Sequence, residues 1–133
     1  MYPKIKLLLL TLGIAFSVSA GKIDKAFGNL KVYNYFEAKL LFEKSMKKQP
    51  AAANYGLAVI YSRTDNPFYN RDSAYISVLR AERLYQILSP KSREKFKKHD
   101  FDSLHIVELR QKISTDFYNL AKAAHTEVAY QDF

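Results

Sequence analysis

Apolar residues recur along this chain at intervals of three and four, the spacing of amphipathic helices. The sequence lacks the sustained alternation of apolar and polar residues that is typical of strands, and it has no Asn-Gly or Asp-Gly hairpin turn. The pattern therefore predicts an all-α fold. Helices are expected around Ile23, Phe27 and Leu30, then up to residue 50, and over residues 51–62, 72–88, 92–98 and 102–123.

Residues suited to helix ends divide these helices into pairs. Lys47 and Lys48 are cations suited to a helix C-terminus, and Pro50 follows them. Asp72 is expected to cap one helix, and Thr126 is expected to cap a last one that begins there. The signals predict antiparallel helical hairpins at about residues 22–50, 51–88 and an incomplete 102–133, with a basic insert at 91–99.

Small and aromatic residues recur at a regular spacing within these pairs. Ala38 and Phe42 are four residues apart, and Pro50 follows eight residues after Phe42. A small residue lets two helices approach closely, while an aromatic ring fills the gap to the next pair. The residues expected to pack the pairs together are Ala38, Phe42, Pro50, Leu57, Ala58, Tyr61, Ala74, Val78, Ala81, Ala129 and Phe133.

On these residues the chain resembles the tetratricopeptide repeat family, including its longer SEL-type relatives. Leu57, Ala58 and Tyr61 match the L-G-x2-Y motif of a first helix, with Ala in place of Gly. The step from Ala74 to Ala129 is longer than one repeat and requires insertions. The resemblance implies a short solenoid of stacked hairpins whose concave face accepts a peptide or helix. A non-repeating helical bundle is the alternative.

Residues 1–20 have the three parts of a secretory signal peptide. Lys4 and Lys6 precede an apolar run at residues 7–16, and small residues follow up to Ala20. A run of that length spans only about 15 Å as a helix, half of a bilayer. We therefore expect export through the secretory pathway, with the mature chain in the periplasm or associated with the outer envelope. An uncleaved anchor and a buried core helix are the alternatives.

The composition is that of a folded protein without disulfides, since the 133 residues are 48% hydrophobic and include no Cys. The missing Cys excludes a disulfide scaffold, a thiol nucleophile, an iron–sulfur cluster and a Cys-bearing zinc site. An exported protein without Cys depends on packing alone, which suits a bacterial envelope. The signal peptide, the Tyr-rich first repeat and the linker at 63–71 also look like the N-terminal region of large exported repeat proteins of Bacteroidota. We expect the natural protein to continue beyond Phe133.

Residues that support catalysis are few. His99, His105 and His125 form neither an H-x3-H pair nor an H-E-x2-H motif. His105 and Glu108 share a helical face, but this pairing is more typical of a solvated surface than of a metal site. The chain has no G-x-S-x-G motif and no Gly-rich loop. We expect no catalytic residue, cofactor or metal within these residues.

Two segments are candidates for contact with a partner. The basic insert, with Lys95, Lys97 and Lys98, suits an anionic surface and accounts for much of the net charge of +8. A solvated helix anchored by Phe96 is the alternative. In the linker, Phe68 and Tyr69 either fold back onto the hairpin or anchor a partner.

These features predict a non-catalytic scaffold or adaptor module that binds another protein or peptide of the cell envelope. The alternative is an accessory repeat domain of an envelope enzyme whose catalytic part lies downstream of this chain. Export argues against a nucleic-acid partner, and contact with an anionic membrane surface is a secondary possibility.

Overall fold

The computed structural model describes residues 21–131, and the side chains up to residue 125. The expected signal peptide at 1–20, the side chain of Ala129 and Phe133 lie outside the described residues. Within this range the chain forms helices and no strand, so the predicted all-α fold is confirmed. The helices are α1 (Lys22–Lys31), α2 (Tyr35–Ser45), α3 (Pro50–Ser62), α4 (Arg71–Gln86), α5 (Pro90–Phe96), the 3-10 turn η1 (Lys97–His99) and α6 (Ser103–Gln131).

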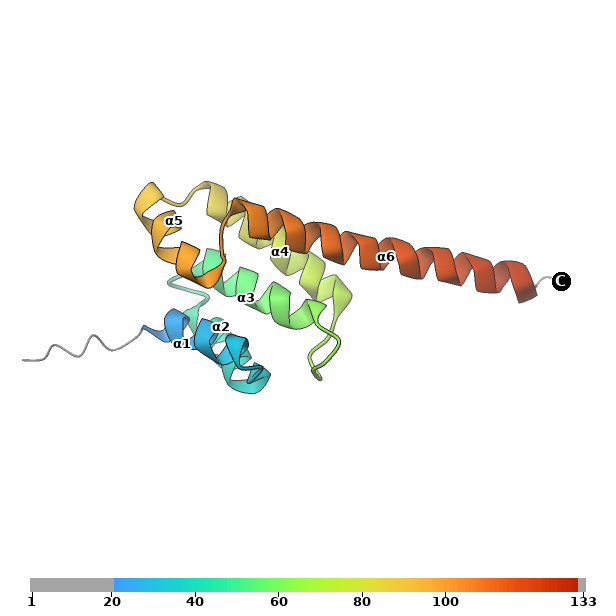
Figure 1. The fold of residues 1–133 in the computed structure, drawn as a ribbon, viewed down its shortest axis with the longest axis horizontal. Helices are drawn as coiled ribbons and strands as arrows, with labels where there is room; N and C mark the ends of the chain where they lie inside the picture. The colour runs from blue at the N-terminus through green and yellow to red at the C-terminus, as the bar shows by residue number, and fades with distance from the viewer. Residues whose placement is uncertain (1–20, 132–133) are drawn as a thin grey trace, which may run out of the picture.

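Successive helices pack as neighbours around α3 (Figure 1). Helices α1 and α2 form one pair, and α3 and α4 form a second pair. Helix α3 also contacts α1 and α2, while α6 lies along α4 and touches α3. Helix α5 and η1 lead the chain from the end of α4 back to the start of α6 (Figure 1).

Helix α3 is the centre of the core because it is apolar on nearly every side. All residues from Ala51 to Ala58 are buried, and the helix carries no charged residue. A helix without a polar face has to be covered on all sides, and its small side chains let the neighbouring helices approach closely. The buried Asn54 amide donates to the Pro50 carbonyl oxygen at 2.8 Å.

A chain of aromatic rings connects the first helical pair to the segment around α5. The Phe27 ring meets Phe42 edge-on at 5.0 Å, and Tyr55 stacks on Phe101 at 4.8 Å. Phe101 in turn contacts Phe96, which is 6% exposed, as the alternative interpretation of the basic insert expects. These contacts hold the basic insert against the core.

Most of the residues expected to pack the helical pairs are in the core. The buried ones are Ala38, Phe42, Leu57, Ala58, Ala74, Val78 and Ala81. Tyr61 is half-buried against the core. Pro50 begins α3 rather than closing α2, because proline fits the first turn of a helix, where its missing N–H costs nothing.

The predicted third hairpin is instead one helix. Helix α6 continues through Thr126, which therefore caps no separate helix, because residues 103–131 contain neither Gly nor Pro to end it. Leu120 follows Ile106, Leu109, Ile113 and Phe117 at helical spacing, which predicts that it is buried with them, but it is 51% exposed. The Arg71 guanidinium lies over the Phe117 ring at 5.5 Å, so α4 begins level with Phe117. Beyond that residue α6 projects away from the other helices (Figure 1).

Two helix starts also differ from prediction. Asn70, not Asp72, caps α4, because its side chain accepts a hydrogen bond from the Ser73 amide at 2.9 Å. Helix α5 begins at Pro90, directly after the cap Ser89.

Among residues 21–131, no helix has the length and apolar character needed to cross a membrane.

Gly56 marks the closest approach of α2 and α3. A Cβ atom added there would overlap the ring of Phe42, which is fully buried. Because that ring is also packed against Phe27, it has no room to move aside. Gly56 is therefore required by packing rather than by backbone conformation.

We expect Gly56→Ala to lower the free energy of unfolding by roughly 1–2 kcal/mol. Alanine gains about 1 kcal/mol of helix propensity, but overpacking against Phe42 costs more. Gly28→Ala is the control, because nothing lies near a Cβ atom at that exposed position of α1, and we expect it to stabilise the chain. Urea unfolding followed by circular dichroism measures both; stabilisation by Gly56→Ala would contradict the packing argument.

Candidate functional site

Two adjoining hollows form a groove across α1, α3 and α6. The first has a volume of about 280 Å³ and is lined by Phe27, Leu30, Lys31, Tyr55, Val59, Arg63, His99, Asp100 and His105. The second has a volume of about 360 Å³ and is lined by Tyr33, Ser62, Arg63, Thr64, Asp65, Lys112 and Asp116. Arg63 lines both hollows and joins them. We call the combined site the α1–α3–α6 groove.

The floor of the groove is aromatic. Phe27 and Tyr55 are both buried, and the Tyr55 hydroxyl donates to the Asp100 carbonyl oxygen at 3.1 Å. Burial, with a smaller contribution from the Asp100 charge, raises the pKa of Tyr55 to about 12. The hydroxyl therefore stays neutral and keeps donating its hydrogen bond, so this part of the floor is rigid and uncharged.

One end of the groove is closed by contacts between η1 and α1. The His99 ring stacks on Phe27 at 4.4 Å, and its Nε2 lies 2.7 Å from Oδ1 of Asp24. Lys98 Nζ lies 3.1 Å from the same oxygen. The hydrogen bond from His99 and the Lys98 charge together lower the pKa of Asp24, although burial opposes them. Asp24 thus anchors η1 to the first helix.

His105 stands at the same end, at the first turn of α6. Asp102 Oδ1 accepts from the His105 amide at 3.0 Å and lies 2.8 Å from Nδ1 of its ring. Asp102 therefore caps α6 and orients the imidazole. Its hydrogen bond to the ring raises the pKa of His105. Burial acts against ionisation of Asp102, but the His105 hydrogen bonds outweigh it and lower the pKa of Asp102.

The opposite end of the groove is formed by Tyr33, which has a left-handed backbone with a φ of 60°. The backbone N–H of Tyr33 donates to the Leu30 carbonyl oxygen at 3.2 Å, and the backbone N–H of Asn34 donates to the Asn29 carbonyl oxygen at 2.9 Å. These two bonds end α1 in a Schellman motif, in which glycine normally takes the left-handed position. Here the position carries an aromatic side chain that is 65% exposed.

Arg63 is held in place beside Tyr33. Its guanidinium carbon lies 5.6 Å from the centre of the Tyr33 ring and 5.9 Å from that of Tyr35. The Tyr35 hydroxyl accepts from Arg63 at 3.4 Å and donates to the Asp65 carboxylate at 2.8 Å. These contacts fix a cation and an aromatic ring side by side at the junction of the two hollows.

The partner-binding residues expected from the sequence lie outside this groove. Phe68 folds back and is half-buried against Phe36 at 4.9 Å, whereas Tyr69 is 39% exposed. Lys97 pairs with Glu94 at 2.6 Å, and the exposed Lys95 lines a separate hollow beside α5. Sequence spacing missed the groove because its lining comes from three helices far apart in the chain. The available signal was Phe27 and Lys31 on the first helix of the first predicted hairpin and Tyr55 on that of the second.

The chemistry of the groove suits recognition of a polypeptide. An apolar floor lies between walls of mixed charge, in which Lys31, Arg63 and Lys112 are matched by Asp65, Asp100 and Asp116, and aromatic rings offer flat contact surfaces. In the part of the chain that the structure describes, no cluster of His, Asp or Glu has the makeup of a metal site. Comparison with protein-family models, curated proteins and solved structures finds no match to this chain.

We expect Tyr33→Gly to be more stable than Tyr33→Ala by about 1 kcal/mol, the reverse of the order at Gly28. Both variants lose the ring contacts, but only glycine adopts the left-handed conformation without strain. Thermal unfolding of the two variants measures the difference. Equal stabilities would mean that the turn imposes no strain at this position.

Asp102→Asn is expected to move the pKa of His105 down toward its ordinary value of about 6.5, because the carboxylate that favours the imidazolium is removed. The folded chain holds the His105 proton more tightly than the unfolded chain. The stabilisation by this pair is therefore present below about pH 6.5 and is lost as the pH rises through the folded-state pKa. It is also lost as the pH falls below the ordinary Asp value of about 3.8 and through the lowered folded-state pKa of Asp102.

Nuclear magnetic resonance titration of the His105 ring measures this pKa in both proteins. The asparagine keeps the helix cap, so a general loss of stability does not explain the shift. An unchanged His105 pKa in the variant would contradict the pairing.

Proposed function

We propose that this chain is an exported, non-catalytic protein-binding module of the tetratricopeptide type, which holds a peptide segment of another envelope protein in the α1–α3–α6 groove. The observation that carries the proposal is the groove itself, to which α1, α3 and α6 contribute, with its aromatic floor and with Lys31 and Arg63 beside that floor.

The order of helix packing supports a repeat array. Helix α1 pairs with α2 and α3 pairs with α4, while α2 packs on α3 and α4 packs on α6. Helices α1, α3 and α6 also contact one another in succession. In a tetratricopeptide array, the first helices of successive repeats line the inner face in this way. On this interpretation α5 and η1 are an insertion, and α6 is the first helix of a third repeat.

The lining of the groove defines the chemistry of its ligand. Phe27 and Tyr55 offer an apolar surface in the first hollow, where Lys31 and Arg63 outnumber the single carboxylate of Asp100. An extended segment with an apolar side chain next to a carboxylate matches both features. Tyr33 is an exposed ring on a fixed backbone, so it contributes contact area with little loss of conformational entropy.

The case for export rests on residues 1–20 and on the absence of Cys, which fits a fold held by packing alone outside the cytoplasm. The described core side chains run from Ile23 to Ile113, so a chain beginning at Gly21 contains all of them. Signal cleavage after Ala20 is therefore compatible with the described fold.

Selection of peptides from a random displayed library against the chain tests the proposed function. We expect enrichment of sequences that pair an apolar residue with Asp or Glu. Fluorescence anisotropy then measures Kd. Lys31→Glu should raise the Kd of the selected peptides about tenfold, because it replaces attraction of their carboxylate by repulsion in the groove.

Arg80→Glu is the matched control, since it makes the same charge change at an exposed position of α4 away from the groove lining. We expect it to leave Kd within about twofold of the parent. Equal weakening by the two variants would reveal a general charge effect and would contradict binding in the groove.

A further inference from the structure

A second surface carries a different chemistry. Lysines from four segments gather at the end of the molecule where α1 begins, and we call this surface the basic end. It comprises Lys22, Lys44, Lys48, Lys95, Lys97 and Lys98. We propose that the basic end docks on a bilayer surface that contains anionic phospholipids.

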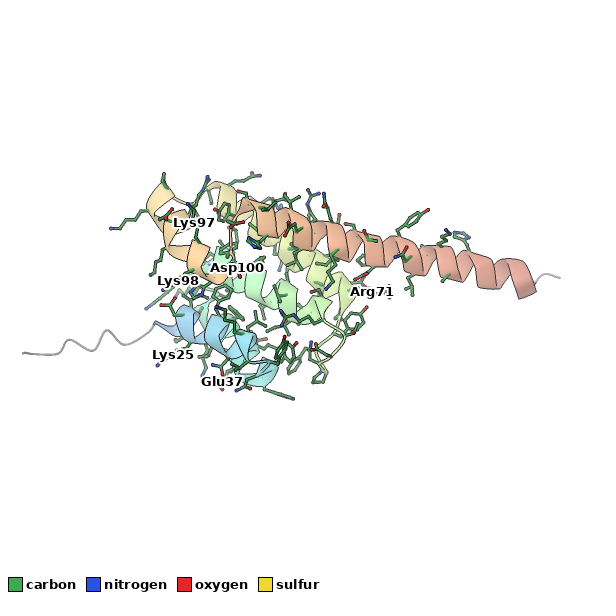
Figure 2. The ribbon with its side chains drawn as sticks, viewed as in Figure 1. Lys25, Glu37, Arg71, Lys97, Lys98 and Asp100 are labelled. Carbon is green, nitrogen blue, oxygen red and sulfur yellow. The ribbon has the colours of Figure 1, made fainter. Side chains whose placement is uncertain are left out.

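The fold brings these residues together from distant parts of the sequence. Lys22, Lys44 and Lys48 line one hollow, and Lys48 and Lys95 line the next. Lys98 reaches α1 through its ion pair with Asp24. Figure 2 places Lys97 and Lys98 at the end of the molecule where α1 begins, opposite the end that carries Arg71.

The charge of the basic end is only partly neutralised. Asp24 is engaged by Lys98 and His99, and Glu94 is engaged by Lys97 at 2.6 Å. Within the described residues, no carboxylate forms an ion pair with Lys44, Lys48 or Lys95. Their ammonium groups therefore produce a positive potential, which attracts phosphate headgroups.

The position of the basic end along the chain favours a membrane over an acidic protein. The apolar run at residues 7–16 ends five residues before Gly21, and Lys22 begins α1. Five extended residues span at most about 18 Å. A bilayer that holds the apolar run, before cleavage or as a lasting anchor, thus lies within reach of these lysines. In this orientation the far half of α6 points away from the membrane (Figure 1).

The proposal is tested by acetylating the lysines of the full chain in the presence of lipid vesicles. Mass spectrometry then gives the acetylation rate of each lysine. In vesicles containing phosphatidylglycerol we expect Lys44, Lys48 and Lys95 to react at least about threefold more slowly than in neutral phosphatidylcholine vesicles. Lys112, which lines the groove, should react equally in both. The protection should disappear near 1 M salt, where the Debye length is about 3 Å.

A charge-reversed variant sharpens the test. Lys44→Glu with Lys48→Glu should abolish the protection of Lys95, whereas Lys31→Glu with Arg80→Glu, of the same net charge, should preserve it. All four positions are exposed, and circular dichroism checks that both variants keep their helices. Equal acetylation rates in the two kinds of vesicle at low salt would overturn the proposal. So would protection that appears only when an acidic protein is added.

Discussion

The contact between Phe42 and the bare backbone at Gly56 is the constraint on which the rest of the arrangement depends. It brings α2 against α3 and so joins the first helical pair to the second. Phe27 packs on the same Phe42 ring, and Tyr55 lies beside Phe27 at 6.5 Å. The floor of the groove is therefore built directly on this contact. A side chain at position 56 would move the floor as well as the core.

Both ends of the groove carry side chains where a helix-ending turn favours glycine. Tyr33 ends α1 with a φ of 60°, and Asp100 follows η1 with a φ of 54°. Aspartate tolerates this conformation better than tyrosine does, because its short polar side chain suits the left-handed region. Residues in such conformations cluster at functional sites, where strain is accepted in exchange for position. The cost at Tyr33 is consistent with a ring kept for contact with a ligand.

The groove and the basic end are separate surfaces linked through α1. Asp24 binds Lys98, which belongs to the basic end, and His99, which lines the groove. The same carboxylate thereby fixes η1 relative to both surfaces. If both proposals hold, a module lying on a membrane through its lysines keeps the groove open to a peptide from a neighbouring protein. The far half of α6 then extends away from the bilayer (Figure 1).

Local patterns were sufficient for the all-α class, for most of the helix ranges and for the burial of Ala38, Phe42 and Ala74, since periodicity and side-chain size act over neighbouring turns. They were insufficient at Leu120, which has the right spacing for the core but lies beyond Phe117, the residue level with the start of α4, and is 51% exposed. The groove was likewise hidden, because residues of α1, α3 and α6 become neighbours only when the helices stack. Spacing along a chain specifies which face of a helix is apolar, whereas the position and length of the neighbouring helices decide whether that face is covered.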